Sequence, residues 1–263
     1  MPPLSRHLNY AFDAFGLAQR HFVVWSNKPL MARETFTYEL QRIEANTLSM
    51  GHMVQKAVVD AVDGLKRRDH AEARRIIRED RNVNPRRYDI ESECMTLIAT
   101  QQPLASDLRA LGSILAIASE LERIHDYSKG IAKISLLIGD VPLIKPLLDL
   151  PRMAFKAQGM LHRAMVAFSR RDVQMARLIP QEDDEVDELY NQIYREVFTY
   201  ILAEPQQLEQ GNYLLWVAHN LERTADRVTN ICERIVYTVT GQLVELDGDE
   251  SLNRFKGSGT IGD

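Results

Sequence analysis

The fold is decided by LERTAD, residues 221–226, because this stretch has an earlier counterpart in LERIHD, residues 121–126. Both read Leu-Glu-Arg-x-x-Asp, and they lie 100 residues apart. The flanking apolar positions agree at the same offset, with Ile114, Ile117, Leu121 and Ile131 matched by Leu214, Val217, Leu221 and Ile231. Upstream, Arg67-Arg68-Asp69 recurs as Arg170-Arg171-Asp172, and Asp80 and Asn84 recur as Asp183 and Asp187, all at an offset of 103. The chain therefore contains one unit of about one hundred residues twice, which predicts a duplicated fold.

Apolar residues spaced three and four apart predict three long helices in each unit. In the first unit, the first helix runs from about Leu40 to Arg68. The second runs from an N-cap at Asp69 to about Thr100, with a kink at Pro85. The third runs from about Leu108 to Leu137 and is capped by Ser106 or Asp107. In the second unit, the first helix covers about 152–170. The second runs from an N-cap at Asp172 through Pro180 to about Ala203, and the third covers about 212–240 after a turn marked by Pro205 and Gly211. The sequence predicts an all-α protein of two tandem three-helix bundles, packed about a pseudo-twofold axis.

The duplication also predicts how the chain is divided. We expect residues 1–32 to be an N-terminal extension, 33–138 the first repeat, 139–151 a linker, 152–246 the second repeat and 247–263 a disordered tail. The regular helical pattern begins at Met31. For this reason we expect residues 1–30 to be an upstream extension or the result of a misassigned start.

Composition excludes several classes of protein. The 263 residues carry a formal net charge of −5, which argues against a nucleic-acid-binding surface. No apolar run approaches the roughly 20 residues that span a bilayer, and no secretory signal opens the chain. Cys94 and Cys232, the two cysteines, lie in helical patterns and are expected to be reduced thiols. We predict a cytoplasmic protein that reaches membranes only through partner proteins.

Clustered carboxylates are the main candidate for a functional site. Glu222 and Asp226 stand four residues apart, so they are neighbours on one face of the last helix. Glu233 extends this row, and Asp183 with Asp187 supplies a second pair on the middle helix. Like charges at this spacing repel by about 0.2–0.5 kcal/mol per pair, and a bound cation removes the repulsion. Carboxylate oxygens suit hard and borderline cations, so we predict a metal site here.

The first repeat carries a reduced version of this site. Asp80, Glu122 and Asp126 occupy the equivalent positions, but Asn84 stands where the second repeat has Asp187. We therefore predict weaker metal binding in the first repeat. His125 offers an imidazole ligand, although a histidine in a helical bundle is more often packed or hydrogen-bonded. The alternative for both repeats is a solvated helix face that its own salt bridges neutralise.

Glu122-x-x-His125 also invites comparison with di-iron carboxylate centres, in which two helices carry Glu-x-x-His. The second repeat has Ala225 where that histidine would stand, which argues against such a centre. The sequence contains no glycine-rich phosphate loop, no Cys-x-x-Cys and no plausible Ser/His/Asp set. We predict that the protein is not an enzyme. A carboxylate-bridged metalloenzyme and a structural bundle without metal function are the alternatives.

Several stretches together resemble the PhoU family of phosphate-uptake regulators over about residues 33–245. They are QQPLASDLR at 101–109, LERIHD at 121–126, LER at 221–223 with Asp226, NICE at 230–233, and Gly241. The resemblance implies two three-helix bundles whose Glu/Asp-x-x-x-Asp pairs bind multinuclear metal clusters on the protein surface. By position, the implied metal ligands are Glu222 with Asp226, Asp183 with Asp187, Glu122 with Asp126, and Asp80 with Asn84 substituted.

The resemblance further implies a negative regulator of phosphate uptake and of the phosphate-starvation response. The expected partners are the ATPase subunit of the phosphate ABC transporter and a phosphate-sensing histidine kinase, which the protein would connect as an adaptor, and we expect a homodimer. The sequence does not choose among iron, zinc, manganese and magnesium, because carboxylates accept all four.

Overall fold

A computed structural model describes the backbone of residues 10–246 and the side chains of residues 33–246. The helices are α1 (Tyr10–Arg67), α2 (His70–Gln101), α3 (Ala105–Ile138), α4 (Asp149–Arg170), α5 (Val173–Leu178), α6 (Asp183–Ala203) and α7 (Leu208–Thr240), with 3₁₀ turns η1 (Ile179–Glu182) and η2 (Pro205–Gln207). Residues 10–246 contain no β-strand. None of the helices in this range combines the length and the hydropathy that crossing a membrane requires.

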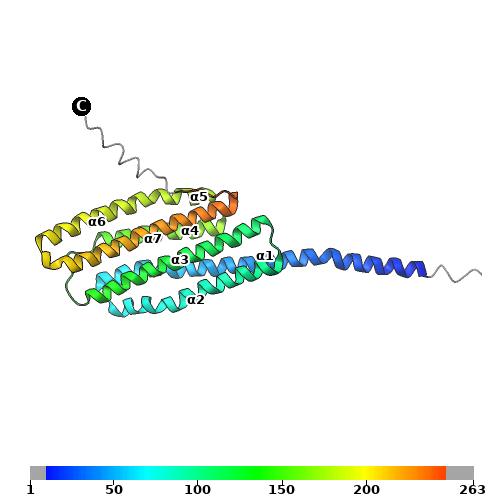
Figure 1. Ribbon diagram of the computed structural model, residues 1–263, viewed down its shortest axis with the longest axis horizontal. Coiled ribbons are helices and arrows are strands. Elements are labelled where there is room, and N and C mark those ends of the chain that lie inside the picture. The colour runs from blue at the N-terminus through cyan, green and yellow to red at the C-terminus, as the bar shows by residue number, and fades with distance from the viewer. Residues whose placement is uncertain (1–9, 247–263) are drawn as a thin grey trace, which may run out of the picture.

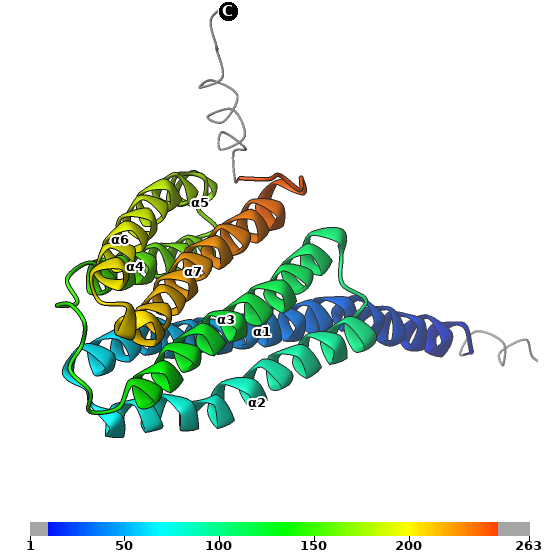
Figure 2. The ribbon, with the colours of Figure 1, turned by 60° about the vertical axis from the view of Figure 1, so that its left-hand side comes forward.

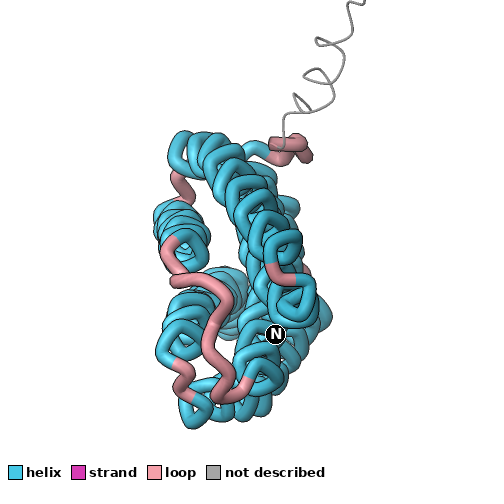
Figure 3. The backbone as a smooth tube through the Cα atoms, turned by 90° about the vertical axis from the view of Figure 1, so that its left-hand side faces the viewer, coloured by secondary structure: helices cyan, strands magenta, loops and turns pink. Residues whose placement is uncertain are grey.

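The helices form two three-helix bundles side by side, as the duplication predicts. α1, α2 and α3 pack together as the first bundle, and α4, α6 and α7 as the second, with α5 and η1 covering one end of α7 (Figure 1). The bundles meet where α3 lies along α7, the two helices running antiparallel (Figure 2). Figure 3 shows the linker between α3 and α4 crossing one end of the molecule. The all-α prediction and its tandem bundles are confirmed.

The repeated apolar positions of α3 and α7 lie in the hydrophobic core. Ile114, Ile117, Leu121 and Ile131 of α3, and Leu214, Val217, Leu221 and Ile231 of α7, are each at most 1% exposed. Burying one such side chain stabilises the fold by about 1.5–3 kcal/mol. The pattern that identified the duplication therefore marks core positions of both bundles.

α1 and α4 form a second contact between the bundles. A Cβ added to Gly51 of α1 would lie 2.9 Å from Met165 Cε of α4, so the two helices approach closely at this point. Beside it, Gln55 Oε1 lies 3.3 Å from His162 Nδ1. α1 therefore belongs to the first bundle but also covers one face of the second.

The repeated Arg-Arg-Asp stretches form the same turn twice. Asp69 Oδ1 accepts hydrogen bonds from Ala71 N at 3.1 Å and Glu72 N at 3.0 Å, and Asp172 Oδ1 accepts one from Met175 N at 3.0 Å. The preceding residues, Arg68 and Arg171, adopt left-handed backbone with φ of 57° and 54°. Both predicted N-caps are confirmed.

Two predicted helix starts are wrong. α3 begins at Ala105 with Leu104 as its N-cap, so neither Ser106 nor Asp107 caps it. Asp107 instead accepts a hydrogen bond from Leu104 N at 3.1 Å and pairs with Arg33 of α1. α1 begins at Tyr10 and not near Leu40, and its first turns project beyond both bundles (Figure 1). Adding residues to an existing helix is much easier than nucleating one, which favours this extension.

The second repeat departs from prediction at a proline and a glycine. Pro180 does not sit inside one continuous helix but divides it into α5, η1 and α6, because proline lacks the amide that the helix interior needs. Gly211 is not in a turn but inside α7. A Cβ there would lie 2.7 Å from Ile201 Cδ1, so the close approach of α6 favours glycine at this position. α2, by contrast, passes through Pro85 without a break. The predicted tail, 247–263, lies outside the described residues.

Candidate metal centre

In the second repeat, α6 and α7 bring predicted carboxylates close to one another. Asp183 is the first residue of α6, and Asp187 follows one turn later. Glu222 lies on α7 with a side chain that is only 25% exposed. Burial raises the pKa of Glu222 to about 7, with further contributions from the negative charges of Asp226 and Asp187. Because Asp187 lies on α6 and Glu222 on α7, this repulsion shows that carboxylates of the two helices form one acidic cluster.

The cluster contains a carboxylate oxygen that lacks a hydrogen bond. Glu222 Oε2 is shielded from solvent, and within residues 33–246 it accepts none. His219 Nδ1 lies 3.1 Å from this oxygen, an attractive contact only when the imidazole is protonated. Burial also raises the pKa of Asp226, against the positive charges of Arg223 and Arg227. Both carboxylates on α7 therefore lie in surroundings that disfavour their negative charge.

The donor chemistry of this cluster fits a cation, but its side chains do not form a coordination sphere. Nowhere in residues 33–246 do three His, Cys, Asp or Glu side chains converge on a point that could hold one metal ion. Glu233, predicted to extend the row, accepts a hydrogen bond from Leu246 N at 3.0 Å and so engages the segment after α7. The shielded, mutually repelling oxygens of Glu222 and its neighbours are what support a cation site here.

The first repeat brings Asp80 of α2 and Asp126 of α3 together on a lysine. Lys129 Nζ lies 2.8 Å from Asp80 Oδ2 and 3.2 Å from Asp126 Oδ1. Burial and the charge of Asp126 raise the pKa of Glu122, while the positive charge of Arg87 opposes this change. Lys129 was not predicted to belong to either site. Its position three residues after Asp126 could have indicated an ion pair between the two. Its contact with Asp80, however, depends on how α2 packs on α3.

His125 lies in the core of the first bundle and is 1% exposed. Burial lowers its pKa, which favours the neutral imidazole. Neither ring nitrogen has a hydrogen-bond partner among the described residues. Its surroundings are therefore those of a histidine packed in a bundle core, the alternative to an imidazole that binds metal.

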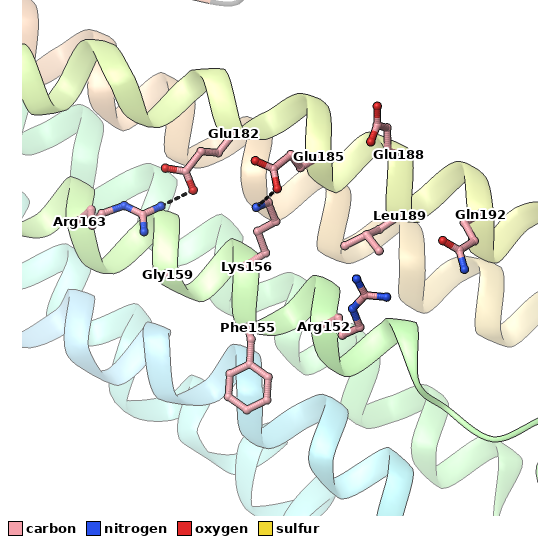
Figure 4. A pocket seen from close by; sticks show the side chains of 10 residues that line it. All are labelled: Arg152, Phe155, Lys156, Gly159, Arg163, Glu182, Glu185, Glu188, Leu189 and Gln192. Carbon is pink, nitrogen blue, oxygen red and sulfur yellow. Dashed lines mark hydrogen bonds and ion pairs between the residues drawn. The ribbon is translucent and has the colours of Figure 1, made fainter.

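A separate open groove of about 650 Å³ lies between α4 and α6 (Figure 4). It is lined by three cationic side chains of α4 and by glutamates of η1 and α6, namely Arg152, Lys156 and Arg163, and Glu182, Glu185 and Glu188. Arg163 Nη2 lies 2.5 Å from Glu182 Oε2, and Lys156 pairs with Glu185. Two ion pairs therefore cross the groove, while Arg152 pairs with Asp149 of its own helix.

Comparison with known proteins identifies both repeats. A family model described as the PhoU domain matches residues 47–135 and 150–235. The chain is 34% identical over 210 residues to the phosphate-specific transport system accessory protein PhoU homolog of Caulobacter vibrioides, covering 80% of this chain and 91% of that protein. It is 35% identical over 222 residues to the phosphate-specific transport system accessory protein PhoU of Escherichia coli, covering 83% and 91%.

Solved structures agree with this result. The crystal structure of the phosphate transport system regulatory protein PhoU from Streptococcus pneumoniae superimposes with a TM-score of 0.74 at 33% identity, over 80% of this chain and 99% of that one. The crystal structure of PhoU from Pseudomonas aeruginosa also gives a TM-score of 0.74, at 32% identity over 79% and 100%.

Proposed function

Because this chain belongs to the PhoU family, we propose that it is an accessory protein of phosphate-specific transport that restrains phosphate uptake and the phosphate-starvation response. The observation that carries this proposal is the match of both repeats, over 91% of the length of the Escherichia coli relative, whose name gives it an accessory role in that transport system. We assign the chain no catalytic step, and we place it in the cytoplasm as a homodimer.

We propose that the second repeat binds divalent metal ions through Asp183 and Asp187 of α6 and Glu222 and Asp226 of α7. Oxygen donors of this kind suit manganese, magnesium, iron or zinc. A bound metal would supply positive charge between two helices whose carboxylates otherwise repel. Glu222 has to lose its proton for this, and its pKa of about 7 means that binding near neutral pH releases protons.

The proposed mode of action is docking to partner proteins, with the ATPase subunit of the phosphate ABC transporter and a phosphate-sensing histidine kinase as partners. Exposed aromatic side chains on the second bundle support a docking role. Tyr194 and Phe198 of α6 are 43% and 42% exposed with ring centroids 4.8 Å apart, and Trp216 of α7 is 60% exposed. Aromatic residues are enriched where proteins bind one another. Tyr190 continues the Tyr194–Phe198 row towards His219 and the carboxylate cluster.

Gene deletion tests the regulatory role. Cells that lack this chain should express phosphate-starvation genes in phosphate-rich medium, and the wild-type gene should restore repression. Normal repression in the deletion strain contradicts the proposed function.

Complementation with variants tests whether the carboxylates matter for that role. E222Q/D226N should fail to restore repression while accumulating to the wild-type level. E209Q, which changes a carboxylate that contacts Tyr213 at the start of the same helix, should restore it. Full repression by E222Q/D226N would separate regulation from the proposed metal site.

A further inference from the structure

The two repeats differ in the side chains that adjoin their carboxylates. Lys129 and Arg87 belong to the first repeat, and the equivalent positions of the second repeat hold Thr229 and Tyr190. The first two side chains are cations and the second two are uncharged at neutral pH. The first repeat therefore has three carboxylates beside two added positive charges, while the second has four carboxylates without them.

Lys129 occupies a specific place between the helices of the first bundle. Its ammonium contacts Asp80 of α2 at 2.8 Å and Asp126 of α3 at 3.2 Å. The side chains of Lys129 and Asp80 are 21% and 20% exposed, so solvent screens this ion pair less than it screens a surface pair. One cation thus bridges the two helices whose counterparts, α6 and α7, carry the carboxylate cluster of the second repeat.

Thr229 leaves the corresponding place without a charge. It is fully buried, and its hydroxyl has no hydrogen-bond partner among the described residues. Arg223 has a counterpart in Arg123 and does not distinguish the repeats. Arg227 does differ and its positive charge acts on Asp226, but its guanidinium lies 3.5 Å from Glu120 of the other bundle and does not bridge α6 and α7. The asymmetry in charge between the two clusters therefore rests on Lys129, with Arg87 adding to it near Glu122.

We propose that Lys129 is a built-in counter-cation that takes the place of a metal ion in the first repeat, so that divalent cations bind only the second repeat. This inference rests on the metal site proposed above. An incoming metal ion would have to displace an ammonium that is already held in position by the chain. It would then leave that ammonium partly buried without a partner, which is unfavourable. Asn84, one turn after Asp80 on α2, offers an uncharged amide where the second repeat has the carboxylate of Asp187.

Binding of Mn²⁺ alone to the purified full chain tests this inference. Isothermal titration and the electron paramagnetic resonance of unbound Mn²⁺ give the Mn²⁺ content of each variant, and circular dichroism confirms folding. We expect E222Q/D226N to lose the Mn²⁺ that the wild type binds, and D80N/D126N to retain it. K129T, which installs the residue of the second repeat, should bind additional Mn²⁺, and adding D126N should remove the gain. K129Q serves if K129T does not fold, and K133T, one turn further along the exposed face of α3, is the matched control.

Two results would overturn the inference: folded K129T and K129Q that bind no more Mn²⁺ than the wild type, or loss of Mn²⁺ from the wild-type background in D80N/D126N. Absence of a metal site in the second repeat would give a different result in the same Mn²⁺ titrations. In that case E222Q/D226N and the wild type bind Mn²⁺ equally, whereas the gain in K129T is still measured as a difference within the first repeat.

Discussion

Arg227 of α7 reaches Glu120 of α3, with 3.5 Å between Nη1 and Oε2, and so places an ion pair in the seam between the bundles. The two side chains are 19% and 18% exposed. Arg223, one turn earlier, lies over the ring of Tyr127 at 5.8 Å from its centroid. Since Tyr127 is the counterpart of Arg227 at the offset of 100, the pseudo-twofold seam uses the same positions differently on its two sides.

This ion pair should contribute measurably to stability because removing one partner leaves the other charge partly buried. We expect E120Q and R227Q each to lower the free energy of unfolding by about 1–3 kcal/mol, with a non-additive double variant. Urea denaturation measures this. D63N, which breaks an exposed ion pair with Arg67, is the control and should cost at most about 1 kcal/mol. Equal costs for the two pairs would show that the seam pair is unimportant.

Metal-free protein should lose stability as pH rises, because Glu222 holds its proton more tightly in the folded state. Its pKa is about 7 in the folded protein, against an ordinary value of 4.5 for a glutamate. The folded state therefore binds more protons between these values, so the stabilisation is complete below pH 4.5 and is lost as pH rises through 7. The expected loss is on the order of 1–3 kcal/mol.

Urea denaturation of chelator-treated protein between pH 5 and 8 measures this loss, with E222Q as the reference that should lack it. If wild type and E222Q show the same pH dependence, Glu222 is not the group that titrates.

Substituting Gly211 should destabilise the protein although alanine favours helices. The new Cβ would lie 2.7 Å from Ile201 Cδ1 and 3.2 Å from Val197 Cγ1, so the side chains of α6 that pack on this position would have to shift. We expect G211A to cost about 1–3 kcal/mol. G112A is the matched control, because that position lies inside α3 with nothing within 4 Å of the added Cβ, and it should stabilise by about 0.5–1 kcal/mol. Thermal unfolding of both variants decides the matter, and a stabilised G211A would contradict the close approach.

The two Asp caps should contribute similar amounts, since they close the same turn in different bundles. D69A and D172A each remove the acceptor for amides at the start of a helix, and we expect a loss of about 0.5–2 kcal/mol for each. The double variant should show the sum of the two losses, because the sites share no partner. A near-zero effect of both, measured by urea denaturation, would mean that water caps these helices equally well.

Local features of this fold were predictable from the sequence. The caps at Asp69 and Asp172, and the buried positions that repeat between α3 and α7, follow from spacing along one chain. Pro180 shows the limit of such reasoning, because the sequence placed a proline within a helical pattern without showing that the helix would split there. For Asp107 the prediction located the right residue near the helix start but assigned it the wrong position in the cap.

Features that depend on packing between helices were not predictable. Gly211 was taken for a turn residue because the sequence cannot show that Ile201 approaches it. Lys129 has an ordinary spacing from Asp126, and only the position of α2 reveals Asp80 on its other side. The sequence also predicted that carboxylates of α6 and α7 come together, as Asp187 and Glu222 do, but that they bind metal stays a prediction.

The close contact of α1 with α4 makes the second bundle depend on the first for part of its cover. If the chain were cut in the linker and the later half expressed alone, Met165 and its neighbours on α4 would face water where Gly51 now covers them. A linker break would therefore leave an apolar strip of the later half wet unless the earlier half stayed bound to it.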